Sequence, residues 1–107
     1  MKFFFQISRK EQKKRIEVLK QDKDTRWRVS GGEDWQNKHY DKCLHVFDRY
    51  LNDTNAPADP WYIVDAKNRK WAELQVLETL VSGIETALKN SNLAVPLLQN
   101  VFPLEKL

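Results

Sequence analysis

Near the start of the chain stands Phe3-Phe4-Phe5-Gln6-Ile7-Ser8-Arg9-Lys10-Glu11, in which a strand signal runs directly into a helix signal. The bulky apolar run 3–7 is typical of a strand that is buried on both faces. Ser8 and Glu11 have the spacing of a capping box, in which the two side chains satisfy backbone donors at a helix start. The stretch therefore predicts a strand followed at once by a helix, the repeating unit of α/β proteins.

The next segment predicts a second helix. After a wholly polar break at 21–25, Ser30 and Glu33 form another capping box. Apolar residues then recur at helical spacing, which predicts a helix that ends near Asn52. The members of this stripe are Tyr40, Leu44, Phe47 and Leu51. Pro57 and Pro60 mark the loop that follows.

A second strand is predicted at Trp61–Val64, where aromatic and β-branched residues stand together. A polar turn leads from it into a long helix with an apolar stripe from Trp71 to Leu88. The element order is strand, helix, helix, strand, helix, which implies parallel strands. Because parallel sheets need more strands and cover on both faces, we expect a fragment of a doubly wound α/β sheet. The remaining strands are expected before Met1.

Composition is that of one globular domain, with 107 residues, 41% apolar and 31% charged. No apolar run approaches a membrane span and no signal-peptide pattern is present, so no membrane partner is expected. Cys43 is the only cysteine, which favours a reducing, cytoplasmic location. The segment 9–28 holds nine basic and four acidic residues, a net +5. This concentration suits a polyanionic partner, and a solvated helix face is the alternative.

Three motifs resemble the polyphosphate kinase 2 family of P-loop kinases. The first is Lys2-Phe3 with Ile7-Ser8-Arg9-Lys10-Glu11-Gln12-Lys13-Lys14-Arg15. The second is Arg26-Trp27-Arg28-Val29-Ser30, and the third runs from Thr54 to Pro60-Trp61. The resemblance covers residues 2–88. The departures are Ala56, Asp59, Lys67-Asn68-Arg69 and Ala72-Glu73, which is consistent with a degenerate domain of a tandem protein.

The resemblance implies that residues 1–90 are the C-terminal part of such a kinase domain, with a lid at about 20–55, and that 91–107 are a linker or docking tail. The function it implies is phosphoryl transfer between polyphosphate and a nucleoside mono- or diphosphate. The phosphate-loop motif Gly-x-x-x-x-Gly-Lys-Ser/Thr is absent. We therefore expect the chain alone to be inactive and to contain no catalytic residue. Mg²⁺ is expected in the parent enzyme, with its ligands outside this chain.

By the same resemblance, the first candidates for holding phosphate are the lid arginines Arg26 and Arg28, because a planar guanidinium binds phosphate in a bidentate manner. Arg15, Lys13 and Lys38 are further candidates. For Arg15 an ion pair with Glu11 within the helix is the alternative.

Asn68 and Arg69 are the candidates for nucleotide binding, since they follow the second strand at the end where open α/β sheets bind ligands. A helix cap by Asn68 is the alternative. His39 and His45 have no partner at ligand spacing, so no metal site is predicted.

The expected partners are inorganic polyphosphate and a nucleotide, in a homo-oligomer. Two other functions stay open. One is a basic nucleic-acid-binding module that uses Arg26-Trp27-Arg28 for stacking and phosphate contact, although the pair of strands makes nucleic acid the less expected partner. The other is a non-catalytic interaction domain of a tandem kinase.

Overall fold

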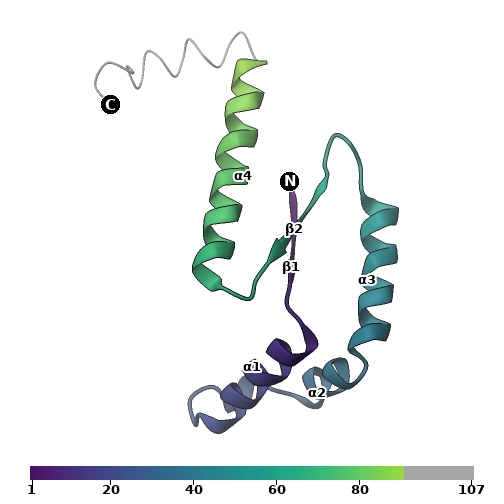
Figure 1. Ribbon diagram of the computed structural model, residues 1–107, viewed down its shortest axis with the longest axis vertical. Coiled ribbons are helices and arrows are strands. Elements are labelled where there is room, and N and C mark those ends of the chain that lie inside the picture. Colours follow the sequence, from purple (N-terminus) through teal and green to yellow (C-terminus); the bar gives the residue numbers. More distant parts are fainter. Residues whose placement is uncertain (91–107) are drawn as a thin grey trace, which may run out of the picture. The chain divides into compact units, whose positions relative to one another are not determined.

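The computed structural model describes residues 1–90, and the predicted tail at 91–107 lies outside them. The elements are β1 (Lys2–Gln6), α1 (Arg9–Gln21), the 3-10 turn η1 (Arg26–Arg28), α2 (Gly31–Lys38), α3 (Tyr40–Thr54), β2 (Trp61–Asp65) and α4 (Arg69–Lys89) (Figure 1). The chain forms two compact units, Met1–Ala72 and Glu73–Leu107, so the boundary falls within α4. None of the described helices is long and apolar enough to cross a membrane.

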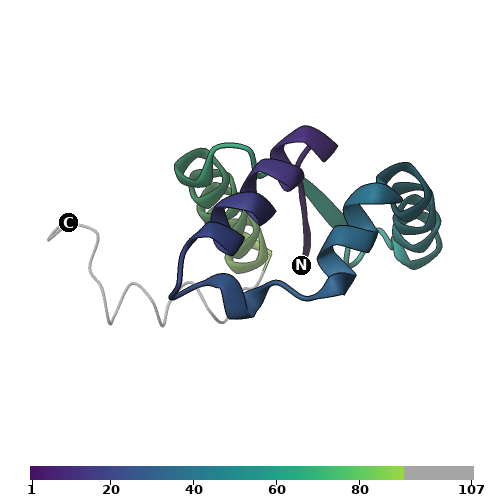
Figure 2. The same ribbon diagram turned by 90° about the horizontal axis from the view of Figure 1, so that it is seen from below.

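β1 and β2 form a parallel two-stranded sheet, as the sequence predicts. Phe3 stands opposite Tyr62, and their rings lie 5.5 Å apart. Beyond the strand ends, the Ala66 N–H donates to the Gln6 carbonyl at 2.9 Å. The two carboxyl ends are therefore adjacent, and α1 and α2 lie beyond the carboxyl end of β1 (Figures 1 and 2). This is the edge at which open α/β sheets bind their ligands.

The helix starts follow the predicted caps, with one difference. Ser30 and Glu33 form the complete capping box at the start of α2. At α1 the Ser8 hydroxyl accepts from the Glu11 N–H at 3.2 Å, but the Glu11 carboxylate binds Arg15 in place of the Ser8 backbone. A carboxylate that faces an arginine one turn away gains a charge-assisted bond.

The predicted second helix is two helices, because the chain breaks at His39. The His39 N–H still donates to the Trp35 carbonyl at 3.0 Å, and the imidazole Nδ1 lies 2.9 Å from the same oxygen. The imidazole also stacks on the Trp35 ring at 4.3 Å. These local contacts stabilise a non-helical His39, with φ −108° and ψ 30°, and α3 starts in a new direction at Tyr40.

The interior of the first unit is small. Ile16 of α1, Val64 of β2 and Ala72 of α4 are its buried apolar side chains among the described residues. Phe4 packs against Phe47 of α3, with 5.7 Å between ring centroids. Many larger side chains stay exposed, which leaves apolar surface along the sheet.

Candidate phosphate-binding surface

An open groove of about 760 Å³ lies between α1 and α2. We call it the basic groove, because five of its lining residues are cationic. Its lining consists of Arg9, Lys10, Lys13, Ile16, Glu17 and Lys20 of α1 with Asp34, Asn37 and Lys38 of α2. The predicted candidates Lys13 and Lys38 thus come together from two helices, and both are exposed. A concave surface with clustered positive charge concentrates an anionic ligand.

Asn37 holds the two helices together at the base of this groove. Its side chain is buried, and its amide nitrogen donates to the Arg9 carbonyl at 3.0 Å and to Gln12 Oε1 at 3.1 Å. Sequence reasoning missed this residue. One feature of the sequence could have indicated a packing role for Asn37. Because α2 has no apolar stripe, this helix has to pack through polar contacts.

The cations of the basic groove differ in their pairing. Lys20 Nζ lies 2.8 Å from Asp34 and 3.6 Å from Glu17, and its hydrogen bond to Asp34 raises the pKa of the lysine. In contrast, no acidic side chain of residues 1–90 forms an ion pair with Lys10, Lys13 or Lys38. These three ammonium groups are available to an anion.

Arg9 adds a further cation to the groove. Its guanidinium donates to the Lys38 carbonyl at 3.3 Å. This hydrogen bond joins the start of α1 to the end of α2. The sequence did not identify Arg9 and Lys10 as candidates for phosphate binding. Both belong to the basic segment 9–28, which the sequence did identify as suited to a polyanionic partner. Which members of that segment face α2 depends on how the helices pair.

Arg26 and Arg28 are exposed on η1 and do not line the basic groove. Between them, Trp27 is 75% exposed, and its indole N–H donates to the Asp24 carbonyl at 2.8 Å. The Arg28 guanidinium lies 5.5 Å from the centroid of that ring. The turn therefore presents an exposed aromatic ring with the Arg28 guanidinium close to it. Phosphate binding by these two arginines stays a prediction.

Arg15 contacts the turn that follows β2. Its Nη2 donates to the carbonyls of Ala66 at 2.8 Å and Lys67 at 2.9 Å, while Nε binds Glu11 at 3.2 Å. The ion pair that was the alternative to phosphate contact is thus formed. The backbone contacts are an additional role that the sequence did not reveal. They tie α1 to the turn after β2.

That turn carries the two candidates for nucleotide binding. Asn68 Oδ1 accepts from the Trp71 N–H at 3.1 Å, so Asn68 caps α4. Arg69 is exposed at the first position of the helix. Both residues stand at the carboxyl end of β2, where an incoming ligand can reach them. Nucleotide binding by these residues stays a prediction.

A metal site is not found in this part of the molecule. Within residues 1–90, no group of three or more His, Cys, Asp and Glu side chains is arranged to hold a metal ion. The two carboxylates that line the basic groove, Glu17 and Asp34, form ion pairs with Lys20. The described residues are suited to bind anions.

Parallel strands that end beside a cationic groove define an α/β protein with a surface suited to anions. The particular family follows from comparison with known proteins. A family model described as polyphosphate kinase 2 matches residues 1–92. The chain therefore belongs to the polyphosphate kinase 2 family, as the three motifs in the sequence indicate.

Two individual proteins are also similar in sequence to this chain. A polyphosphate:AMP phosphotransferase of Pseudomonas aeruginosa is 32% identical over 87 residues, which are 81% of this chain and 18% of that protein. An uncharacterized protein in the chlN 3' region of Leptolyngbya boryana is 29% identical over 101 residues, which are 94% of this chain and 71% of that protein. The chain thus spans about a fifth of the Pseudomonas relative and most of the Leptolyngbya one.

The fold has a counterpart among solved structures. The crystal structure of polyphosphate kinase 2 from Arthrobacter aurescens matches 80% of this chain with a TM-score of 0.73 and 24% identity. The match takes up 31% of that chain. This likeness confirms the α/β fold predicted from the sequence.

Proposed function

We propose that this chain is part of a polyphosphate-dependent nucleotide phosphotransferase, in which it holds the phosphate chain. The reaction would move a phosphoryl group between polyphosphate and a nucleoside mono- or diphosphate. The observation that carries the proposal is the basic groove, found in a chain that belongs to this family. Within residues 1–90, its lysines Lys10, Lys13 and Lys38 form no ion pair with an acidic side chain. In this proposal residues 1–90 belong to the kinase domain, and residues 20–55 act as its lid.

The chemistry explains why cations are needed. Phosphoryl transfer depends mainly on positioning the phosphates and neutralising their charge. Lysine and arginine side chains can do this along a chain of phosphates, and the arginines add bidentate contacts. We propose that the parent enzyme uses Mg²⁺ for the reacting phosphates. Within residues 1–90 no group of three or more His, Cys, Asp and Glu side chains is arranged to hold a metal ion, and we propose that the ligands of Mg²⁺ lie in another part of the enzyme.

We also propose that the 107 residues alone do not transfer phosphate, because they contain no Gly-x-x-x-x-Gly-Lys-Ser/Thr motif to cradle the reacting group. A cytoplasmic location fits the proposal as well. Cys43, the one cysteine of the sequence, is unpaired and suits a reducing compartment.

The test is a binding measurement with long-chain inorganic polyphosphate on the full chain. The variant Lys13→Gln with Lys38→Gln removes two cations of the basic groove. The matched control, Lys23→Gln with Lys42→Gln, removes two exposed cations that do not line it. The groove variant should bind about tenfold more weakly than the control. Equal losses in both variants would mean a nonspecific basic surface and would contradict the proposal.

One observation favours nucleic-acid binding as the second candidate. Trp27 offers an exposed ring between two arginines, which is the arrangement used to stack single-stranded bases. A single-stranded DNA of matched charge, titrated beside polyphosphate, separates the two functions. Tighter binding of the DNA, lost with Trp27→Ala, would favour this candidate.

A further inference from the structure

One side of α4 is apolar and exposed. The residues on it are Leu74, Leu77, Val81 and Ile84. Their spacing of three, four and three residues places them along one side of the helix. In the same order, their exposed fractions are 43%, 59%, 54% and 55%. We call these four residues the exposed stripe. Contiguous apolar surface of this kind marks an interaction site.

Acidic residues flank the exposed stripe. Glu78 and Glu85 stand beside it on one side of the helix and Glu73 on the other, and all three are exposed. None of them forms an ion pair with a basic side chain of residues 1–90. Two stripes packed against each other would bring these carboxylates together, and like charges repel. The stripe therefore suits an occupant without negative charge better than a second α4.

The sequence supplies an uncharged segment directly after α4. Residues 91–104 contain no Asp, Glu, Lys or Arg, and we call them the uncharged segment. Pro96 and Pro103 disfavour a helix there and favour an extended conformation. Eight of the fourteen residues are apolar, namely Leu93, Ala94, Val95, Leu97, Leu98, Val101, Phe102 and Leu104. An extended apolar segment thus follows an apolar helix face in the same chain.

The length and the starting point of the uncharged segment allow it to reach the exposed stripe. Ile84 lies five residues before Lys89, the last residue of α4, and Leu74 lies fifteen residues before it. At a rise of 1.5 Å per residue, the stripe extends from about 7 to about 22 Å back along the helix. Fourteen extended residues span up to about 46 Å. Such a short connection costs little chain entropy and keeps the segment at a high effective concentration.

One relative matches this part of the sequence. The Leptolyngbya boryana protein matches 101 of the 107 residues, so at most six are unmatched. At least eight residues of the uncharged segment therefore fall within the match. The polyphosphate kinase 2 family model, in contrast, ends at residue 92. The segment is thus shared with a relative and is not part of what the family model describes.

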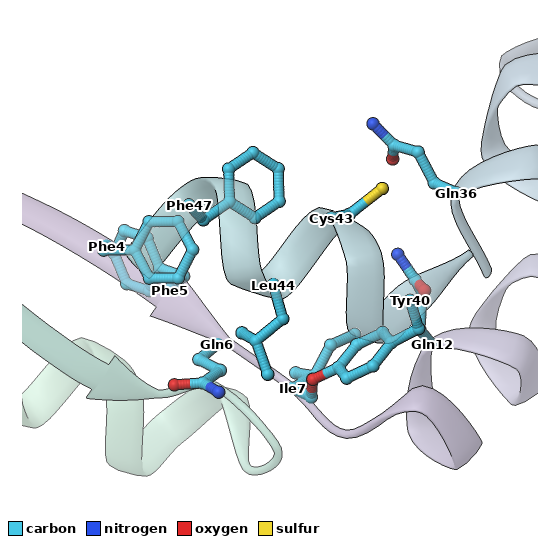
Figure 3. A pocket seen from close by; sticks show the side chains of 10 residues that line it. All are labelled: Phe4, Phe5, Gln6, Ile7, Gln12, Gln36, Tyr40, Cys43, Leu44 and Phe47. Carbon is cyan, nitrogen blue, oxygen red and sulfur yellow. The ribbon is translucent and has the colours of Figure 1, made fainter. Parts of the chain in front are cut away.

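The first unit also has an apolar hollow, between β1 and α3. Figure 3 shows its lining, to which Phe4 of β1 and Leu44 and Phe47 of α3 contribute. Its volume is about 100 Å³, and a cavity of about 150 Å³ accommodates one benzene molecule. The hollow therefore has room for about one side chain and not for fourteen residues. The exposed stripe is the apolar surface whose length fits the segment.

We propose that the uncharged segment docks on the exposed stripe of α4 in the same copy of the chain. Its apolar side chains cover the stripe, while the carboxylates of Glu78 and Glu85 stay in water beside it. The segment acts as a strap that keeps the stripe away from other apolar surfaces. This inference does not depend on polyphosphate binding.

A spin label on the full chain tests the docking. Gln99→Cys in a Cys43→Ser background carries a nitroxide, and nuclear magnetic resonance follows the amide signals of α4. We expect the Leu74 amide to lose at least as much intensity as the Leu88 amide. A segment that leads away from the helix would affect Leu88 most, because Leu74 lies about 21 Å further along α4. That result would overturn the proposal.

Two charged variants test the stripe itself. Val81→Glu places a carboxylate on the exposed stripe, whereas Ser82→Glu places one on the next exposed residue, outside it. Burying an unpaired carboxylate is costly, so Val81→Glu should reduce the intensity loss at Leu74 at least threefold and Ser82→Glu should leave it nearly unchanged. Equal effects would contradict the proposal. Circular dichroism verifies that both variants fold.

The competing sites and occupants give different results. If Leu44→Glu releases the segment and Val81→Glu does not, the segment docks in the hollow between β1 and α3 and the proposal is wrong. A mixture of spin-labelled chain with unlabelled, isotope-enriched chain detects docking between copies. Intensity loss at Leu74 in that mixture would show a second copy on the stripe and would also overturn the proposal. No loss at Leu74 in either sample would leave the stripe to another partner, such as a basic helix, and would reject the strap.

Discussion

Arg15 Nη2 donates a hydrogen bond of 2.8 Å to the carbonyl oxygen of Ala66, 51 residues further along the chain. The same nitrogen reaches the Lys67 carbonyl at 2.9 Å. One side chain of the basic helix α1 thus holds the turn that connects β2 to α4. Because that turn carries Asn68 and Arg69, Arg15 links the helix that lines the basic groove to the candidate nucleotide side.

Replacing Arg15 tests this link. Arg15→Ala should lower the free energy of unfolding by about 1–2 kcal/mol, since charged donors contribute more than neutral ones and this side chain is only partly buried. Urea denaturation measures the change. Lys14→Ala removes an exposed cation from the next position and should change stability by no more than about 0.5 kcal/mol.

Hydrogen exchange distinguishes the backbone link from a plain ion pair. In Arg15→Ala the amides after β2 should exchange faster than in the wild-type chain, while those of α3 should not change. Arg15→Lys keeps the ion pair with Glu11 but loses the planar fork, so it should recover less than half of the stability. Full recovery by lysine would show that the two carbonyl contacts contribute nothing.

Asn37 provides a second test, because its buried amide joins α2 to α1. Asn37→Ala should cost about 1–3 kcal/mol, since it leaves the Arg9 carbonyl and Gln12 without their donor. Polyphosphate affinity should fall as well, because the two walls of the basic groove lose their connection. The control Gln36→Ala changes an exposed neighbour. If polyphosphate binding survives the loss of Asn37, the groove is not the binding surface.

Asp34 opposes the binding of anions in the basic groove. Asp34→Asn removes a negative charge and releases Lys20, which it holds at 2.8 Å. Polyphosphate should then bind up to about fivefold more tightly, the range that one exposed ion pair allows. Asp41→Asn makes the same charge change on α3, outside the groove lining. An equal gain in both variants would reveal an effect of net charge only.

The pH dependence of this pair has a definite sign. The hydrogen bond to Asp34 raises the pKa of Lys20 above its ordinary value. The stabilising effect of the pair is therefore fully present below the unfolded pKa of about 10.4 and is lost as pH rises through the higher folded pKa. In Asp34→Asn the alkaline loss should be smaller. Titration of the Lys20 side chain by nuclear magnetic resonance measures its folded pKa in the wild-type chain and in Asp34→Asn.

The strands and their direction could be predicted because short-range patterns determine them. Residues 3–7 and 61–64 are apolar runs separated by helices, which forces parallel pairing. The break at His39 could not be predicted, since neither proline nor glycine stands at or beside that position. The contact that produces it, an imidazole beside the Trp35 carbonyl, has no periodic signature.

The candidate site was predictable as a charge cluster and not as a surface. Lys13 and Lys38 line the basic groove, but Lys20, in the same segment, is held by Asp34. Charged residues stand on nearly every side of α1, so the spacing of residues in the sequence does not indicate which cation faces α2. The contacts of Arg15 could not be predicted either, because its carbonyl partners lie in a segment distant in sequence.

The two arginines of η1 give the last prediction, since they stand apart from the basic groove. If they belong to a lid that holds a phosphate chain, Arg26→Ala with Arg28→Ala should weaken polyphosphate binding about tenfold. Replacing both by lysine keeps the charge but loses the planar fork, so binding should still fall about threefold. Lys14→Ala with Lys23→Ala, two exposed cations of the same segment, is the matched control and should matter less.

Salt and the choice of ligand complete this test. Binding to exposed guanidinium groups should weaken steeply with ionic strength, because charges are screened over about 8 Å at physiological salt. Trp27→Ala should leave polyphosphate binding nearly unchanged, because polyphosphate has no aromatic face to stack on the exposed ring. Single-stranded DNA would lose affinity in that variant if the ring stacks bases. A lid for polyphosphate therefore requires sensitivity to both arginines and indifference to the tryptophan, measured by titration of both ligands at two salt concentrations.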